Sequence, residues 1–161
     1  MAAMLMGAWS LQSCDNEPTK EVWLDEFGQD SCYVQDWGML EVNRSVVHTP
    51  LTVNGVVYER GLGAHSISRL LYDLDGKAVS ISGLAGADDK NLFAGKLQFK
   101  ILGDKKELWK SGVMQKGDPV KEFNVNLKGV DKVLLLVEEC GDGIMYDHAD
   151  WLNVKITTRG D

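Results

Sequence analysis

The residues that could do chemistry in this chain gather in two short segments, residues 61–65 and 141–151. The first reads Gly-Leu-Gly-Ala-His, and the second reads Gly-Asp-Gly-Ile-Met-Tyr-Asp-His-Ala-Asp-Trp. Each places a histidine beside glycines or carboxylates, and each adjoins a run whose alternation is typical of a strand. The second also brings three acidic side chains together with a tyrosine and a tryptophan. Convergent polar groups beside aromatic surface suit either a sugar-binding face or a loop stabilised by a metal ion.

The candidates for contact with a sugar are Trp37, His65, Asp88, Asp89 and His148. An indole in a glycine-containing loop can stack on the apolar face of a pyranose, or it can act as a lid over one end of the fold. A neutral imidazole can donate to one hydroxyl and accept from another, or it can pin its own loop from inside. The two histidines fall at expected strand ends, where they can meet across a sheet edge. The adjacent carboxylates can accept hydroxyl hydrogens or form a solvated turn.

Carboxylates from opposite ends of the chain are candidates for a calcium site: Asp25, Asp147 and Asp150, with Glu26 and Asp142 beside them. Calcium takes about six to eight oxygen ligands from carboxylates and backbone carbonyls. The sequence has no EF-hand spacing, so the ligands would have to come from distant loops. The first and last strands of a sandwich often lie side by side, which permits such an assembly. The expected ion is a structural Ca²⁺.

Other chemistries find little support in the sequence. The formal net charge is −7 and the longest basic run is Lys105-Lys106, so the chain lacks the clustered lysines and arginines that bind nucleic acid. It contains no Gly-x-Ser-x-Gly elbow, no His-Glu-x-x-His motif and no glycine-rich phosphate loop after a strand. A binding module is therefore favoured over an enzyme. A sandwich that docks another protein without binding sugar is the alternative, and titration with galactosides separates the two.

Hydrophobic alternation of period two predicts an all-β protein. Residues 96–101, 122–128 and 151–157 alternate in this way, as half-buried antiparallel strands do. Asn54-Gly55 lies between two apolar runs and predicts a hairpin, because both residues accept positive φ. The continuous apolar run 133–137 predicts a central strand. Short strands separated by glycine turns, with no helical face, favour one antiparallel β-sandwich domain over residues 22–158.

Residues 1–21 differ from the rest of the chain and are expected to form a signal segment and linker. Residues 1–11 are apolar and uncharged, a run too short for a spanning helix of about 20 residues. The sequence Leu11-Gln12-Ser13-Cys14 resembles the lipobox of bacterial lipoproteins, in which the cysteine is acylated. No Lys or Arg precedes it and Gln12 is unusual there, so a signal-peptide remnant or a cloning-derived terminus is the alternative. The first interpretation predicts a secreted or cell-surface bacterial lipoprotein anchored at Cys14.

Two further cysteines, Cys32 and Cys140, lie far apart in the sequence. In a secreted protein they could form one bridge between the first loop and the last strands, or they could remain two thiols. Neither belongs to a Cys-x-x-Cys pair, so they do not fit a zinc site.

From about residue 22 to residue 157 the sequence resembles the NPCBM domain, a type of carbohydrate-binding module related to carbohydrate-binding module family fifty-one. The matching segments follow the family's order: Asp36-Trp37-Gly38, the hairpin 50–58, the glycine-histidine segment 61–66, then 71–74, the Gly-x-Asp-Asp loop 86–89, 97–101, 109–114, and Asp147-His148-Ala149-Asp150-Trp151. The resemblance implies a jelly-roll, galactose-binding-domain-like sandwich that binds galactose-containing glycans. It also implies a bracing calcium ion and association with a glycoside hydrolase, although the sequence itself shows no catalytic domain.

Overall fold

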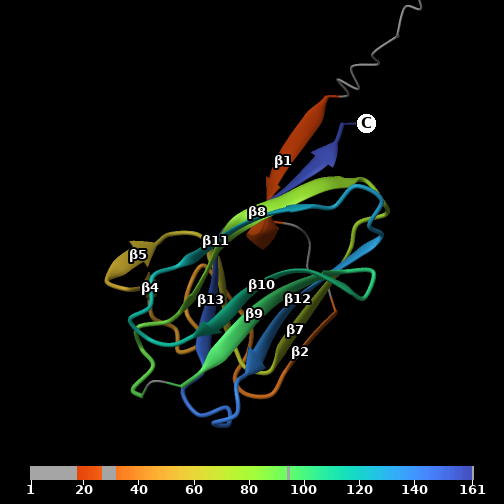
Figure 1. Cartoon of the computed structure of the whole chain (residues 1–161). Coiled ribbons are helices and arrows are strands. Elements are labelled where there is room, and N and C mark those ends of the chain that lie inside the picture. Colours follow the sequence, from red (N-terminus) through yellow and green to blue (C-terminus); the bar gives the residue numbers. More distant parts are fainter. Residues whose placement is uncertain (1–17, 27–31, 94, 161) are drawn as a thin grey trace, which may run out of the picture.

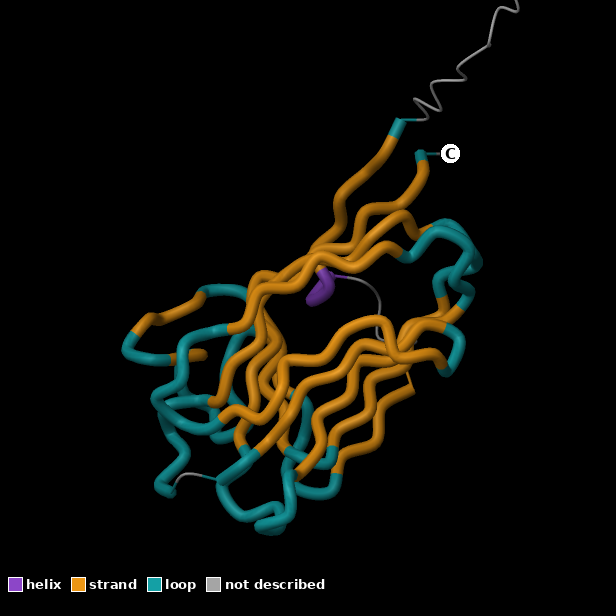
Figure 2. The backbone as a smooth tube through the Cα atoms, viewed as in Figure 1, coloured by secondary structure: helices purple, strands orange, loops and turns teal. Residues whose placement is uncertain are grey.

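The computed structural model describes residues 18–26, 32–93 and 95–160, which form two antiparallel sheets packed face to face (Figures 1 and 2). The first sheet has the strand order β11-β8-β13-β6-β3, and β1 also pairs with β13. The second sheet has the order β10-β9-β12-β7-β2, and β4 pairs with β5 in a separate hairpin. The predicted antiparallel β-sandwich is confirmed.

The bounds of the elements agree with the alternating runs of the sequence. In chain order they are β1 (Thr19–Trp23), the single 3-10 turn η1 (Leu24–Glu26), β2 (Cys32–Gln35), β3 (Glu41–Val42), β4 (Leu51–Val53), β5 (Val56–Tyr58), β6 (Gly61–His65), β7 (Ser68–Asp73), β8 (Ala78–Ala87), β9 (Leu97–Gly103), β10 (Lys106–Met114), β11 (Lys121–Asn126), β12 (Lys132–Glu139) and β13 (His148–Arg159). Within the described ranges, no helix is long and apolar enough to cross a membrane.

The inward-facing side chains of the two sheets form one core. Every second residue of β7 from Ser68 onward is buried, and so is every second residue of β9 from Leu97 onward, as expected where one face of a strand meets the core. Trp151 lies fully buried and makes edge-to-face contacts with Phe99 and Phe123, at ring-centroid distances of 4.9 and 5.7 Å. Strand β12 lies in the middle of its sheet, as the apolar run 133–137 predicted.

The β4–β5 hairpin has the turn that the sequence predicts. Asn54 and Gly55 adopt φ values of 49° and 78°, the left-handed conformations that a two-residue hairpin turn requires. The carboxylate of Asp89 accepts hydrogen bonds from both backbone N–H groups, at 3.0 Å from Asn54 and 2.8 Å from Gly55. A residue thirty-four positions away in the sequence therefore fixes this turn.

Strand β13 connects most of the first sheet. It pairs with β8 along one edge, and with β6 and then β1 along the other. In this register His148 lies opposite His65, so the two histidines meet as expected. Strand β1 begins at Thr19 and pairs with the end of β13, so the expected domain boundary at residue 22 falls inside a strand.

The glycines of residues 61–65 serve close backbone packing. A Cβ atom on Gly63 would lie only 2.3 Å from the carbonyl oxygen of Arg44, which is far inside van der Waals contact. Glycine at this position lets the segment after β3 lie directly against β6.

A bridge between Cys32 and Cys140 is excluded by the register of the second sheet. Cys32 pairs with Leu71, and Leu71 pairs with Leu134 of β12. Cys140 follows β12 and lies six residues beyond Leu134, a separation of roughly 20 Å along the strand direction. A disulfide needs Cα atoms about 4.4–6.8 Å apart. Cys140 is accordingly a free thiol.

Candidate functional site

Three aromatic rings meet at the end of the sandwich where β6 ends and β13 begins. The ring centroid of Trp37 lies 5.0 Å from that of His65 and 5.7 Å from that of His148. The two imidazoles are 5.5 Å apart. Trp37 stacks on His148 with an interplanar angle of 6°. Segments that are far apart in the sequence thus build one compact ring cluster, formed by Trp37, His65 and His148.

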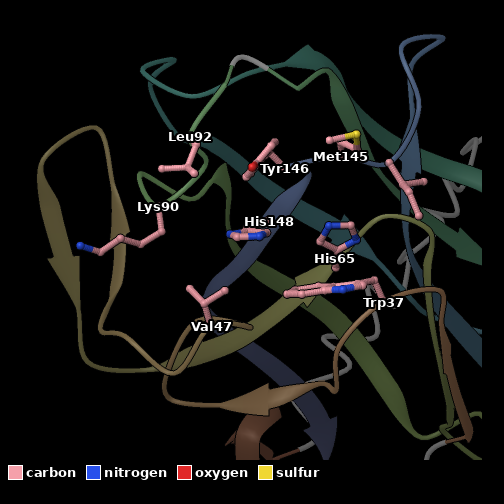
Figure 3. Close-up of a pocket in the computed structure, with 9 residues that line it drawn as sticks. Trp37, Val47, His65, Lys90, Leu92, Met145, Tyr146 and His148 are labelled. Carbon is pink, nitrogen blue, oxygen red and sulfur yellow. The ribbon is translucent and has the colours of Figure 1, made fainter.

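The ring cluster lines a hollow of about 600 Å³. The complete lining is Trp37, Val47, His65, Lys90, Leu92, Ile144, Met145, Tyr146 and His148. Figure 3 shows Trp37 and Val47 along one side of it, Leu92, Tyr146 and Met145 along the opposite side, and the two imidazoles between them. The volume falls within the range of roughly 300–1,000 Å³ that is usual for small-molecule sites.

Trp37 is the open member of the ring cluster. Its side chain is 49% exposed, whereas both histidines are buried. The side chain of Gln35 holds the loop that carries Trp37. The Gln35 amide nitrogen donates to the Trp37 carbonyl at 2.8 Å, and the Gln35 amide oxygen accepts from the His65 N–H at 3.1 Å. The indole is therefore fixed by its backbone and packed on one imidazole, yet it keeps aromatic surface free for a ligand.

The hydrogen bonds of His65 define its tautomer. Its Nδ1 lies 2.6 Å from the carbonyl oxygen of Ser66, and a carbonyl can only accept, so Nδ1 carries the hydrogen. In the neutral ring Nε2 is then an acceptor. Burial lowers the pKa of His65, opposed by the Ser66 carbonyl and by Asp36. The neutral form therefore dominates near pH 7.

His148 is held by its backbone rather than by its ring. The Asn91 side chain accepts from the His148 N–H at 2.8 Å and donates to the His148 carbonyl at 3.0 Å. Asn91 thus pairs with the start of β13 much as a neighbouring strand would. The Nδ1 atom of His148 is buried and has no hydrogen-bond partner among the described residues. Burial, together with the nearby His65, lowers the pKa of His148 despite the opposing effect of Asp88.

Asp147 is a partly satisfied buried carboxyl beside the ring cluster. Its Oδ2 accepts from the Ser66 hydroxyl at 2.5 Å, and its carbonyl accepts from the Ser66 N–H at 3.1 Å. Its Oδ1 is buried with no partner in the described part of the chain. Burial raises the pKa of Asp147 to about 6, with the Ser66 hydrogen bond acting in the opposite direction.

Asp88 and Asp89, two of the expected sugar ligands, do not line the hollow. Asp88 is fully buried, and its carboxylate accepts from the Lys90 N–H at 2.6 Å and the Thr52 N–H at 3.4 Å. Asp89 holds the β4–β5 turn. Both carboxylates accept hydrogen bonds from backbone N–H groups of this chain, and neither forms part of the candidate site.

The three expected metal ligands lie in three different environments. Asp25 contacts Arg60 at 3.3 Å and Asn43 at 3.2 Å, and Asn43 in turn accepts from the Gly61 N–H, at the opposite end of β6 from His65. Asp150 is fully buried, where burial and the neighbouring Asp88 raise its pKa well above the usual range. Among the described residues, no group of three or more His, Cys, Asp or Glu side chains could hold a metal ion. Of the three, Asp147 alone combines a buried unpartnered oxygen with a place beside the hollow.

Several residues of the site were not singled out from the sequence. Tyr146, Met145 and Ile144 lie within the segment 141–151, but nothing in the sequence shows that these three line a hollow. Leu92 and Asn91 lie in the loop between β8 and β9, where the sequence marks only the preceding aspartates. The hydrogen bonds of Asn91 join positions 57 residues apart, so only the folded chain reveals its role.

Comparison with known proteins identifies the family. The family model "NPCBM/NEW2 domain" matches residues 20–157. The chain belongs to the NPCBM/NEW2 family. It is therefore a carbohydrate-binding module of the NPCBM type rather than the catalytic part of an enzyme.

The NPCBM module spans only a small part of the curated relatives that it matches. It is 29% identical over 130 residues to Alpha-1,3-galactosidase B of Akkermansia muciniphila, covering 78% of this chain and 16% of the galactosidase. A solved structure of CBM51 from Clostridium perfringens GH95 in complex with methyl-galactose has 24% identity and a TM-score of 0.77, and covers 85% of this chain and 99% of that one. A second structure contains the M60 catalytic domain with the CBM51-1 and CBM51-2 domains of C. perfringens ZmpB. It has 23% identity and a TM-score of 0.77, and the match covers 88% of this chain and 15% of that one. These structures establish the shared fold.

The Asn91 contacts lead to a prediction. In Asn91→Ala the buried His148 N–H loses its acceptor, so the free energy of unfolding should fall by about 1–3 kcal/mol. The ring of His148 should also lose its parallel stacking on Trp37, which a shift of the Trp37 indole N–H resonance would report. Asn124→Ala, at an exposed position of β11, serves as the control and should change neither quantity. Wild-type stability and an unshifted indole resonance in Asn91→Ala would contradict the assigned role.

Proposed function

We propose that this module binds galactose-containing glycans in the hollow lined by the ring cluster. The observation that carries the proposal is the convergence of one half-exposed indole and two neutral imidazoles on one hollow. Galactose has an apolar patch on one face of its ring and an axial hydroxyl at C4. One aromatic platform with a few hydrogen-bonding groups beside it complements that combination. The methyl-galactose complex of the C. perfringens GH95 module supports this choice of sugar.

The hydrogen-bonding groups can be assigned from the structure of the free site. Trp37 offers its exposed indole face for stacking. His65 donates its Nδ1–H to the Ser66 carbonyl, which leaves Nε2 to accept from a sugar hydroxyl. This acceptor exists only on the neutral ring. Because burial lowers the pKa of His65, the acceptor is retained at neutral pH and lost as the pH falls through that lowered pKa.

We further propose that the module works as an accessory to a glycoside hydrolase. The chain spans 16% of the Akkermansia muciniphila galactosidase that it resembles, and in the ZmpB structure modules of this fold accompany a catalytic domain. A non-catalytic module that binds weakly to the glycan keeps an attached active site near its substrate by raising the effective concentration. Secretion of the protein is part of this proposal, since such glycans lie outside the cell.

Sugar binding can be tested by calorimetry with a panel of galactosides. Wild type is expected to bind with a dissociation constant between millimolar and micromolar, about 4–8 kcal/mol. Trp37→Ala should weaken binding at least tenfold, because the stacking surface is lost, and His65→Ala should weaken it through the lost acceptor. Tyr33→Ala removes an aromatic residue that is 41% exposed but lies outside the hollow, and it should bind like wild type.

Melting curves of all variants serve as the folding control. Absence of heat with every galactoside from folded wild type would overturn the proposal and favour a protein-docking module. Undiminished binding by folded Trp37→Ala would move the site elsewhere on the sandwich.

We also propose a structural calcium ion near Asp147. The support is its buried and unpartnered Oδ1 and the position of the Met145 and Tyr146 carbonyl oxygens. Both carbonyl oxygens lie close to the Asp147 carboxyl around Gly95, so further oxygen donors are near it. Asp147 and these two carbonyls would hold the ion, whose role would be to fix the loop that forms one wall of the hollow.

Calcium should raise the melting temperature, and the rise should depend on pH. At a free concentration about 100 times the dissociation constant, one site adds about 2.7 kcal/mol to stability. The pKa of Asp147 is about 6, so the carboxylate is available at pH 7.5 and largely protonated at pH 5, where the rise should shrink. Asp147→Asn should abolish the response, whereas Asp25→Asn, beside Arg60, should keep it. Equal melting with calcium and with chelator at pH 7.5 would refute the site.

We propose, finally, that Cys14 carries a lipid anchor. Cys14 lies outside the described residues, and the support is the lipobox-like sequence Leu11-Gln12-Ser13-Cys14. Expression from the native gene should place the protein in the membrane fraction, and Cys14→Ser should release it into the soluble fraction. Identical fractionation of the two forms would refute the anchor.

A further inference from the structure

One wall of the hollow is more apolar than a single sugar ring needs. Leu92 is 70% exposed and Met145 is 73% exposed, and together with Ile144 they line the hollow. Figure 3 shows Leu92, Tyr146 and Met145 along the side that lies across from Trp37. Single exposed aliphatic side chains are ordinary on a protein surface, but several that converge on one hollow mark a contact surface.

The volume of the hollow also exceeds the volume of a single sugar ring. A hexose has about twelve non-hydrogen atoms, and even if each took the share of a water molecule, about 30 Å³, the ring would fill roughly 360 Å³. The hollow measures about 600 Å³. A galactose stacked on Trp37 would therefore leave space in front of the wall of Leu92 and Met145.

The wall is also held in place before any ligand arrives. Tyr146 meets Phe93 edge to face at 5.0 Å, which ties the loop before β13 to the loop before β9. The Asp142 carboxylate accepts from the Lys96 N–H at 3.1 Å, and the Glu139 carboxylate accepts from the Gly141 N–H at 2.6 Å. A surface fixed in this way loses less conformational entropy on binding than a mobile one.

We propose that this wall is a second subsite, which takes the acetamido group of an N-acetylhexosamine joined to the galactose. The inference rests on the proposed function, since it presumes galactose on Trp37. An acetamido group combines a methyl with an amide. Leu92 and Met145 offer aliphatic surface to the methyl, and the hydroxyl of Tyr146 in the same wall can donate to the amide carbonyl or accept from its N–H. Methionine adapts its shape to such a group with little strain.

The test uses pairs of disaccharides that differ only in the acetamido group. One pair is N-acetyllactosamine and lactose, and the other is galactose linked α1,3 to N-acetylgalactosamine or to galactose. Burial of one methyl favours the N-acetylated member about fourfold, so wild type should prefer it by about three- to fivefold in at least one pair. The double variant Leu92→Ser/Met145→Ser should lose this preference, while it still binds methyl galactoside. Val57→Ser, at an exposed position of the β4–β5 hairpin, should behave like wild type.

The outcomes separate this proposal from the one on which it rests. If wild type binds methyl galactoside but shows no preference in either pair, the subsite is refuted and galactose binding stands. If the double variant keeps the preference, or loses methyl galactoside as well, the wall does not act as a separate acetamido subsite. If wild type binds no galactoside, both proposals fail, and the titration with methyl galactoside is enough to show this outcome. Both substituted side chains are exposed, and melting curves confirm the fold.

Discussion

The register of β13 is the constraint on which the rest of the structure depends. This strand pairs with β8 on one edge and with β6 and β1 on the other, and a slip of one residue would turn every side chain to the opposite face. Trp151 opposes such a slip, since its buried ring contacts Phe99 and Phe123 in the core. The same register places His148 opposite His65. Core packing and the geometry of the candidate site are thus set by one strand.

Beneath the site, the sandwich buries polar groups at a cost to its stability. Asp88 organises the loop between β8 and β9 through the N–H groups of Thr52 and Lys90, and that loop carries Asn91, which holds His148. Asp150 lies fully buried next to Asp88, and burial together with this neighbouring carboxyl raises the pKa of Asp150. A buried carboxyl with a raised pKa, such as Asp150, is costly for folding, and such groups are concentrated at functional sites. Asp88 is tied to the site directly, because its backbone N–H donates to the His148 carbonyl at 3.0 Å.

The fold could be predicted from local patterns in the sequence, whereas the roles of the loop side chains could not. The strands and the Asn54-Gly55 turn follow from alternation and backbone preference, which are properties of neighbouring residues. The meeting of the two histidines followed from their positions at strand ends. Asp88 and Asp89 resembled ligand-binding carboxylates in sequence but bind backbone N–H groups of the hairpin and its neighbours. The donors to Asp89 lie more than thirty residues away, so no local rule could decide which way this carboxylate points. Asp88 accepts from the Lys90 N–H two residues away as well as from Thr52.

Because His65, Asp147 and His148 are buried, the stability of the protein and the proposed sugar binding should depend on pH in different ways. The pKa values of His65 and His148 are lowered by burial, so their contribution to stability is complete above the unfolded value of about 6.5 and is lost as the pH falls below it. Asp147, with a pKa raised to about 6, acts in the opposite sense, because its contribution is present below the unfolded value and is lost as the pH rises through about 6. Around pH 4–6.5 the two effects on stability therefore oppose each other. The proposed hydrogen bond from a sugar hydroxyl to His65 requires the neutral imidazole and has no such compensation, so acidification should weaken glycan binding by a module that is still folded.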